Sequence, residues 1–90
     1  MIDLTGKHIF VAGGSRGIGR AVCRLAAGAG ADVSVNYLRN REAADAAVAE
    51  IEAAGRRGVA VQADIAEPGA AQRAVAEANA AMGRELDGLW

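Results

Sequence analysis

Hydrophobic positions follow two different periods along the chain, and the two periods alternate in a regular order. Short apolar runs rich in β-favouring residues predict three strands, at 8–12, 32–37 and 58–63. Longer segments, in which apolar residues recur every three or four positions, predict three helices, at 18–28, 41–54 and 68–82. Residues 86–90 have the pattern of the first part of a fourth strand.

The helical segments also predict which side chains face the core and where the helices begin and end. In the first helix the expected apolar stripe consists of Ile18, Val22, Leu25, Ala26 and Ala29. In the second helix it consists of Ala44, Ala47, Val48, Ile51 and Ala54. Asn40 suits the N-cap of the second helix, and Pro68 suits the first turn of the third. Gly55 and Gly83 are the expected stop signals.

The order of these elements is β-α-β-α-β-α, followed by the start of a strand. Such alternation with short connections is typical of the α/β class, in which right-handed helical crossovers join parallel strands. We therefore predict a Rossmann-type parallel sheet that forms an incomplete doubly wound fold. Ninety residues make one small domain at most. Residues 1–90 are therefore expected to lie within a single domain.

Composition narrows the range of partners and compartments. The formal net charge is −1, the pI is about 5.7 and the basic residues are scattered, so no nucleic-acid partner is expected. No apolar run approaches the roughly 20 residues of a membrane span, and residues 1–7 lack the layout of a signal peptide. With one cysteine, Cys23, the chain cannot form an internal disulfide, which favours a reducing, cytoplasmic setting.

The strongest candidate for chemistry is the glycine-rich turn between the first strand and the first helix. Its glycines are spaced Gly13-x-x-x-Gly17-x-Gly19. Such a turn presents backbone N–H groups to a phosphate, and the start of the helix adds a partial positive charge. Glycine is needed where a side chain would block the nucleotide or where φ is positive. Ser15 adds a hydroxyl to this predicted phosphate site. The alternative interpretation is a flexible turn without a ligand.

The segment 12–19, AGGSRGIG, resembles the cofactor loop of the short-chain dehydrogenase/reductase family, whose usual form is T-G-x-x-x-G-I-G. The resemblance continues through 36–37, 62–65 and 83–87, and it is greatest to 3-oxoacyl-carrier-protein reductases and glucose-dehydrogenase-like members. Ala12 stands where the family usually has a threonine that braces the turn. Its absence is expected to loosen the loop by about 1 kcal/mol. The resemblance implies that residues 1–90 correspond to the N-terminal third of family members and form the N-terminal part of a dinucleotide-binding (Rossmann) domain.

The end of the second strand predicts the choice of cofactor, and by the resemblance the deciding position is Tyr37. In a Rossmann-type site an acidic residue there binds the ribose 2′-hydroxyl and repels a 2′-phosphate. No carboxylate is present at 36–38, whereas Arg16 and Arg39 are placed to meet a phosphate with a planar guanidinium. The sequence therefore favours NADP(H) over NAD(H). Taken singly, Arg39 or Arg41 is also explained as the solvated start of a helix.

The resemblance implies an adenine site after the third strand. Asp64 resembles the family aspartate that contacts the adenine amino group, with Ile65 lining the pocket, although an aspartate here also suits a turn cap. The expected cofactor-binding residues are Gly13, Ser15, Arg16, Gly17, Ile18, Gly19, Asn36, Tyr37, Arg39, Asp64 and Ile65. No metal site is expected, because His8 has no ligand-type neighbours at suitable spacing. Cys23 is expected to pack within the first helix.

The catalytic groups of the family have no counterpart in this sequence. Family members carry a serine and a Tyr-x-x-x-Lys pair. The tyrosine of this pair exchanges a proton with the substrate oxygen during hydride transfer. Residues 1–90 contain none of these groups in the family's arrangement. We therefore expect the NADP(H)-binding segment of a carbonyl/alcohol oxidoreductase, inactive alone and derived from a homo-oligomeric parent protein. The alternatives are a non-catalytic nucleotide-binding or interaction module, and a truncated product without its own function.

The family topology also predicts how the layers are covered. It places the first strand at the centre of the sheet, the first two helices on one face and the third helix on the other. The short strand at 86–90 would cover its edge of the sheet poorly. Exposed apolar surface and poor solubility are therefore expected.

Overall fold

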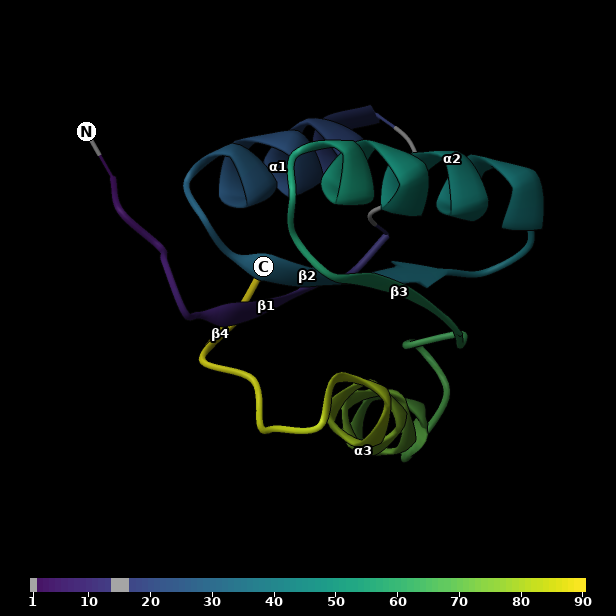
Figure 1. The fold of residues 1–90 in the computed structure, drawn as a ribbon. Helices are drawn as coiled ribbons and strands as arrows, with labels where there is room; N and C mark the ends of the chain where they lie inside the picture. The colour runs from purple at the N-terminus through teal and green to yellow at the C-terminus, as the bar shows by residue number, and fades with distance from the viewer. Residues whose placement is uncertain (1, 14–16) are drawn as a thin grey trace.

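The computed structural model describes residues 2–13 and 17–90, and these form one four-stranded sheet flanked by helices (Figure 1). The strands are β1 (His8–Val11), β2 (Asp32–Tyr37), β3 (Gly58–Gln62) and β4 (Gly88–Leu89). The helices are α1 (Gly17–Gly28), α2 (Arg41–Ala53) and α3 (Ala70–Met82). Within the described residues, none of the helices has the length and apolar character needed to cross a bilayer.

The sheet is parallel throughout, with the strand order β3-β2-β1-β4. Strand β1 pairs with β2 along its whole length, and it pairs with β4 only at Ile9 and Phe10. The chain therefore moves outward from β1 to β3 and then crosses back to the other side of β1. This reversal is the Rossmann-type topology predicted from the sequence. Strands β1 and β3 each end one residue before the predicted end.

Two hydrophobic clusters hold the helices against opposite faces of the sheet. Figure 1 shows α1 and α2 on one side and α3 on the other. Because side chains alternate along a strand, Val11 and Val35 pack in the cluster with α1 and α2, whereas Phe10 and Val61 pack with α3. The predicted division, two helices on one face and one on the other, is confirmed.

The apolar stripe predicted for α1 is wrong in part. Ile18 and Leu25 are each 74% exposed, whereas Cys23, Ala26 and Ala27 are buried. The helix approaches the sheet through small side chains, so its buried face is rotated away from the row that contains the largest apolar residues. The expectation that Cys23 packs within the helix is confirmed, and burial raises the pKa of its thiol to about 11.

Helix α2 begins and ends close to the predicted signals. The Asn40 side chain accepts a hydrogen bond from the N–H of Ala43 at 2.9 Å, which confirms the predicted N-cap. The helix ends at Ala53, so Ala54 is exposed and does not belong to the buried stripe. Gly55 follows with a φ of 82°, a left-handed conformation that suits its predicted place after the helix.

Helix α3 begins two residues later than predicted, and β4 is shorter than predicted. The N-cap of α3 is Gly69, whose left-handed backbone (φ 77°) leaves Pro68 outside the helix. Gly83 (φ 80°) is the C-cap, as predicted. Only two residues of the segment 86–90 form a strand, although backbone hydrogen bonds join Asp87 to His8 and Trp90 to Phe10 and Ala12.

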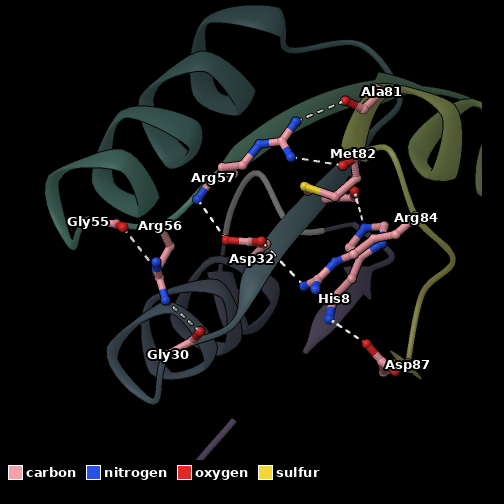
Figure 2. A network of polar contacts seen from close by, with 11 residues as sticks. His8, Gly30, Asp32, Gly55, Arg56, Arg57, Ala81, Met82, Arg84 and Asp87 are labelled. Atoms are coloured by element: carbon pink, nitrogen blue, oxygen red, sulfur yellow. Dashed lines mark hydrogen bonds and ion pairs between the residues drawn. The ribbon is translucent and has the colours of Figure 1, made fainter. Parts of the chain in front are cut away.

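A polar network fixes α3 near the edge of the sheet where β2 and β3 begin (Figure 2). The carboxylate of Asp32 accepts from the backbone N–H of Arg57 at 2.9 Å and lies 3.3 Å from the guanidinium of Arg84. The Arg57 side chain donates to the carbonyl of Met82 at 2.9 Å. A cation at this last turn of α3 stabilises the negative end of the helix. The network leaves the opposite edge of the sheet, where the strands end, open to other contacts.

Exposed apolar side chains lie beside β4. Leu25, Leu89 and Trp90 are 74%, 66% and 53% exposed. They line a groove of about 670 Å³ together with Ile2, Leu4, Ile9, Val22, Ala26, Gly28, Ala29 and Gly88. The predicted exposed apolar surface is therefore confirmed, while its effect on solubility stays a prediction.

Candidate functional site

The carboxyl ends of β1, β2 and β3 lie at one edge of the sheet, and α1 begins at the same edge (Figure 1). In open parallel α/β sheets, ligands bind in the crevice outside the carboxyl ends of the strands. The described candidate residues lie at this edge, at the ends of these strands, in the connections that follow them or in the first turn of α1. The fold therefore brings together residues that are far apart in the sequence.

The glycines on either side of the first turn have backbones that other residues avoid. Gly13 follows β1 with a φ of 64°, and Gly17 opens α1 with a φ of 61°. Both values lie in the left-handed region, where a Cβ costs energy. A Cβ added at either glycine meets no described protein atom within 4 Å. No described atom thus covers these two backbone positions beside the positive end of α1, an arrangement that suits a phosphate.

A pocket of about 1050 Å³ lies between this turn and the start of α2. Its lining consists of Gly13, Gly17, Tyr37, Leu38, Arg39, Asn40, Arg41 and Glu42. Tyr37 is 4% exposed and contributes a buried part of the wall, whereas Arg39 and Arg41 are exposed. The pocket has the size of a small-molecule site, and it joins the glycine turn to the end of β2.

Among the described residues, the charged side chains that line this pocket are Arg39, Arg41 and Glu42. The Arg41 guanidinium lies 3.5 Å from Asp45, and the neighbouring Tyr37 and Asp45 raise its pKa. Glu42 lies in the first turn of α2. Planar guanidinium groups such as those of Arg39 and Arg41 suit a phosphate. No group of three His, Cys, Asp or Glu side chains within residues 2–13 and 17–90 is placed to hold a metal ion.

Asn36 lies beneath this pocket and does not line it. Its side chain is 2% exposed. The Oδ1 atom accepts from the N–H of Gly13 at 3.1 Å, and the Nδ2 atom donates to the carbonyls of Val61 and Ala63 at 3.3 and 3.2 Å. The polar atoms of Asn36 are therefore engaged by the backbone around the site.

Asp64 and Ile65 follow β3, and both are half-buried. Oδ1 of Asp64 accepts from the N–H of Ala66 at 3.0 Å, which is the turn-capping contact expected as the alternative to an adenine contact. Asp64 lines a separate, smaller pocket of about 340 Å³. Ile65 packs against the cluster around Phe10. The carboxylate has a second oxygen, so the turn cap leaves it able to accept another hydrogen bond.

The other predicted site residues have different surroundings. Ile18 is exposed in the first turn of α1, and Gly19 is buried in the same helix. Neither lines the pocket. Ser15 and Arg16 lie outside the described residues, so their predicted roles stay predictions.

Sequence reasoning did not assign Leu38, Asn40, Arg41 and Glu42 to the site, although all four line the pocket. A polar and charged helix start is explained by capping and solvation alone, so their residue types contain no specific signal. Their place directly after the strand that ends at Tyr37 is the signal that could have identified them.

The chain is similar to known proteins along most of its length. Residues 7–90 match the family model described as short chain dehydrogenase. An L-rhamnose 1-dehydrogenase (NAD(P)(+)) from Sphingomonas sp. strain SKA58 is 48% identical over 81 residues, which cover 90% of this chain and 32% of that protein. A 3-oxoacyl-[acyl-carrier-protein] reductase from Synechocystis sp. strain PCC 6803 is 48% identical over 66 residues, which cover 73% of this chain and 27% of that protein.

Solved structures give the same picture. The structure of a short chain dehydrogenase from Burkholderia cenocepacia J2315 in complex with NADP has a TM-score of 0.89 to this chain and 50% sequence identity. The match covers 96% of this chain and 35% of that one. This chain therefore spans about a third of the length of the proteins it matches.

Proposed function

Since this chain belongs to the short-chain dehydrogenase family, we propose that it forms the NADP(H)-binding part of an oxidoreductase that interconverts a carbonyl compound and an alcohol. The observation that carries this proposal is the pocket at the carboxyl edge of the sheet. There the open glycine turn meets two arginines that follow β2. Under this proposal, residues 1–90 bind the cofactor. The catalytic serine, tyrosine and lysine of family members have no counterpart in this sequence.

Three groups of described residues support this proposal, one for each of three parts of NADP(H). Gly13 and Gly17 leave room for the pyrophosphate beside the start of α1. Arg39 and Arg41 supply cationic donors for the 2′-phosphate, at a strand end that bears no carboxylate. Asp64 follows β3, where its carboxylate would accept from the adenine amino group. The rest of the proposed contact set rests on the family resemblance and consists of Ser15, Arg16, Ile18, Gly19, Tyr37 and Ile65, whereas Asn36 would act through the backbone around the site.

The nicotinamide of the bound cofactor supplies or accepts the hydride, as in other nicotinamide enzymes. The residues of this chain would bind and orient the cofactor, and they would hold its anionic groups against the helix start and the guanidinium groups. Tyr37 is not proposed as a proton donor, because it is buried at the end of β2 and is followed four residues later by Arg41 in place of a lysine.

One similarity supports the choice of NADP(H), since the similar dehydrogenase from Burkholderia cenocepacia was solved in complex with NADP. The similar enzyme from Sphingomonas is named for NAD(P)(+), which covers both cofactors. The relatives are named for substrates as different as L-rhamnose and an acyl-carrier-protein conjugate, so the proposal is restricted to the reaction class.

The test is a calorimetric titration of the 90-residue chain with NADPH and, separately, with NADH. The proposal predicts saturable binding of both or of NADPH alone, with the smaller dissociation constant for NADPH. Equal or tighter binding of NADH would contradict the assignment of the 2′-phosphate site. Binding of neither would contradict the proposal as a whole and would favour the alternative of an interaction module.

A further inference from the structure

The side chain of Asn36 links three strands directly beneath the proposed site. We infer that Asn36 is a positioning residue, which sets the separation between the glycine turn after β1 and the end of β3 that carries Asp64. The inference rests on the proposed function, because it concerns how two parts of one dinucleotide site are held in register. It goes beyond a direct contact with the cofactor, which the buried amide of Asn36 is not placed to make.

The first half of the link fixes the glycine turn. Gly13 lies two residues beyond the end of β1, so its N–H has left the ladder of strand hydrogen bonds. Oδ1 of Asn36 accepts from this N–H at 3.1 Å. The contact orients the peptide group at the point where the backbone enters the left-handed conformation, with a φ of 64°. A side chain of β2 thereby determines where the turn begins.

The second half of the link fixes the end of β3. Nδ2 of Asn36 donates to the carbonyl of Val61 at 3.3 Å and to that of Ala63 at 3.2 Å. Asp64 follows Ala63 directly, so the second contact lies one residue from the carboxylate of the proposed adenine site. The backbone N–H of Ala63 also donates to the carbonyl of Tyr37 at 3.0 Å, which keeps β3 paired with β2 up to this point.

An asparagine suits this place because of its hydrogen-bonding groups. A carboxamide offers one acceptor and two donors, and here the acceptor faces β1 while the donors face β3. Aspartate retains the acceptor and loses the donors, and alanine loses both. A buried polar group whose hydrogen bonds are all made fixes one arrangement of its neighbours, since any displacement leaves a buried group without a partner.

Ser34 provides a matched control on the same strand. It lies two residues before Asn36, so its side chain is on the same face of the sheet, and it is also buried. Its hydroxyl contacts Nε2 of His8 at 2.7 Å. Removal of either side chain thus deletes a buried polar contact from β2, but only Asn36 reaches the glycine turn and β3.

A dinucleotide binds at both parts of the site at once, and its affinity depends on their relative placement. Loss of the link should therefore weaken NADPH, which reaches the glycine turn with its pyrophosphate. Adenosine 2′-monophosphate lacks the 5′-phosphate that would reach the glycine turn, so it represents the adenosine half alone and does not need the two parts in register. The ratio of the two dissociation constants is the readout of positioning, and a general loss of stability does not change it.

The experiment compares Asn36→Ala and Ser34→Ala with the wild-type chain in titrations with NADPH and adenosine 2′-monophosphate. For Asn36→Ala, which removes three hydrogen bonds around the site, we expect NADPH to weaken by about tenfold and the monophosphate by less than about twofold. For Ser34→Ala we expect the ratio to stay at the wild-type value. Equal weakening of both ligands by Asn36→Ala, or no weakening of either, would overturn the inference.

A second variant and a measurement without ligand cover the case in which Asn36→Ala fails to fold. Asn36→Asp keeps the acceptor for Gly13 and removes the donors to β3, and we expect it to weaken NADPH more than adenosine 2′-monophosphate. Hydrogen exchange of the Gly13 amide reports the first contact directly. We expect slow exchange in the wild-type chain and in Asn36→Asp. Exchange at the rate of an unstructured peptide in the wild-type chain would overturn the inference.

The outcomes separate this inference from the proposed function. Failure of the wild-type chain to bind either ligand contradicts the proposed function, and the exchange of the Gly13 amide then decides whether Asn36 holds the turn. Wild-type binding of NADPH with an unchanged ratio in both Asn36 variants leaves the proposed function standing and contradicts the positioning role.

Discussion

The imidazole Nε2 of His8 lies 2.7 Å from the hydroxyl of Ser34, and both side chains are fully buried between the sheet and α3. The other ring nitrogen, Nδ1, is buried and has no hydrogen-bond partner among the described residues. Protonation would place a charge in this interior. The pair is therefore compatible with the neutral imidazole.

This arrangement predicts that the chain becomes less stable in mildly acidic solution. Burial is the main cause that lowers the pKa of His8, and the charge of Arg84 adds to it, while neighbouring backbone carbonyls and Asp32 oppose it (Figure 2). The unfolded chain, with a histidine pKa of about 6.5, therefore binds the proton more tightly than the folded one. The contribution of neutral His8 to the free energy of unfolding is therefore complete above about pH 6.5. At lower pH the free energy of unfolding decreases, by at most about 1.4 kcal/mol per pH unit.

Urea unfolding at several pH values between 7.5 and 5.5 measures this effect, and His8→Val is the control variant. We expect the pH dependence that His8 causes in this window to disappear in the variant, because valine does not titrate. A wild-type chain whose stability is constant over the window would show that His8 is accommodated in its charged form.

The glycine turn leads to a second prediction, with Gly55 as its control. Gly17 and Gly55 have φ values of 61° and 82°, and a Cβ at either meets no described protein atom within 4 Å. Replacement of either by alanine should cost about 1 kcal/mol of unfolding free energy through the left-handed backbone. Only the methyl group at Gly17 enters the proposed phosphate site, so only Gly17→Ala should weaken NADPH, by on the order of tenfold. Thermal unfolding and calorimetry measure the two effects, and equal NADPH affinity in both variants would contradict the site.

A third prediction concerns the 2′-phosphate. Arg39→Gln removes a guanidinium that lines the pocket, and a hydrogen bond to a charged group contributes about 1.5–3 kcal/mol. We expect NADPH to weaken by about tenfold or more and NADH to be unaffected. Arg24→Gln is the control, since Arg24 pairs with Glu50 at 2.8 Å and does not line the pocket. A parallel loss of NADPH and NADH affinity in Arg39→Gln would reject a role in reading the 2′-phosphate.

The apolar groove beside β4 leads to a fourth prediction. Leu25 is 74% exposed within it, so Leu25→Gln should change the free energy of unfolding by less than about 0.5 kcal/mol. Because large exposed apolar patches promote association, we expect the variant to self-associate less than the wild-type chain. Sedimentation at increasing concentration measures this. Leu38→Gln, which is exposed outside the groove, should leave association unchanged, and an equal effect of both variants would contradict the role of the groove.

Much of the fold was predictable because its signals act over short distances. The Asn40 side chain caps α2 through a residue three positions away, and Gly55 ends the helix through its own backbone. The rotation of α1 was not predictable in this way. Two neighbouring rows, one with Leu25 and one with Cys23, both have helical spacing, and the choice between them depends on how closely α1 approaches β1 and β2.

In the candidate site, too, features with local signals were predictable and features that depend on long-range contacts were not. The glycine turn and the arginine after β2 belong to local patterns, so the sequence predicts them as candidates. The link made by Asn36 joins Gly13 and Ala63, which lie 23 and 27 residues away in the chain. Only the register of the three strands brings these groups together. No local pattern around Asn36 contains that information.

The central claim is that the carboxyl edge of the sheet binds NADP(H) between the glycine turn and the start of α2. The most direct measurement is a residue-resolved titration of the backbone amide resonances of the 90-residue chain with NADPH. We predict saturable shifts that are largest at Gly13, Gly17, Leu38 and Arg39, with the amide of Gly55 unaffected. Shifts confined to the groove beside β4 or to α3, or no shifts at all, would contradict the claim.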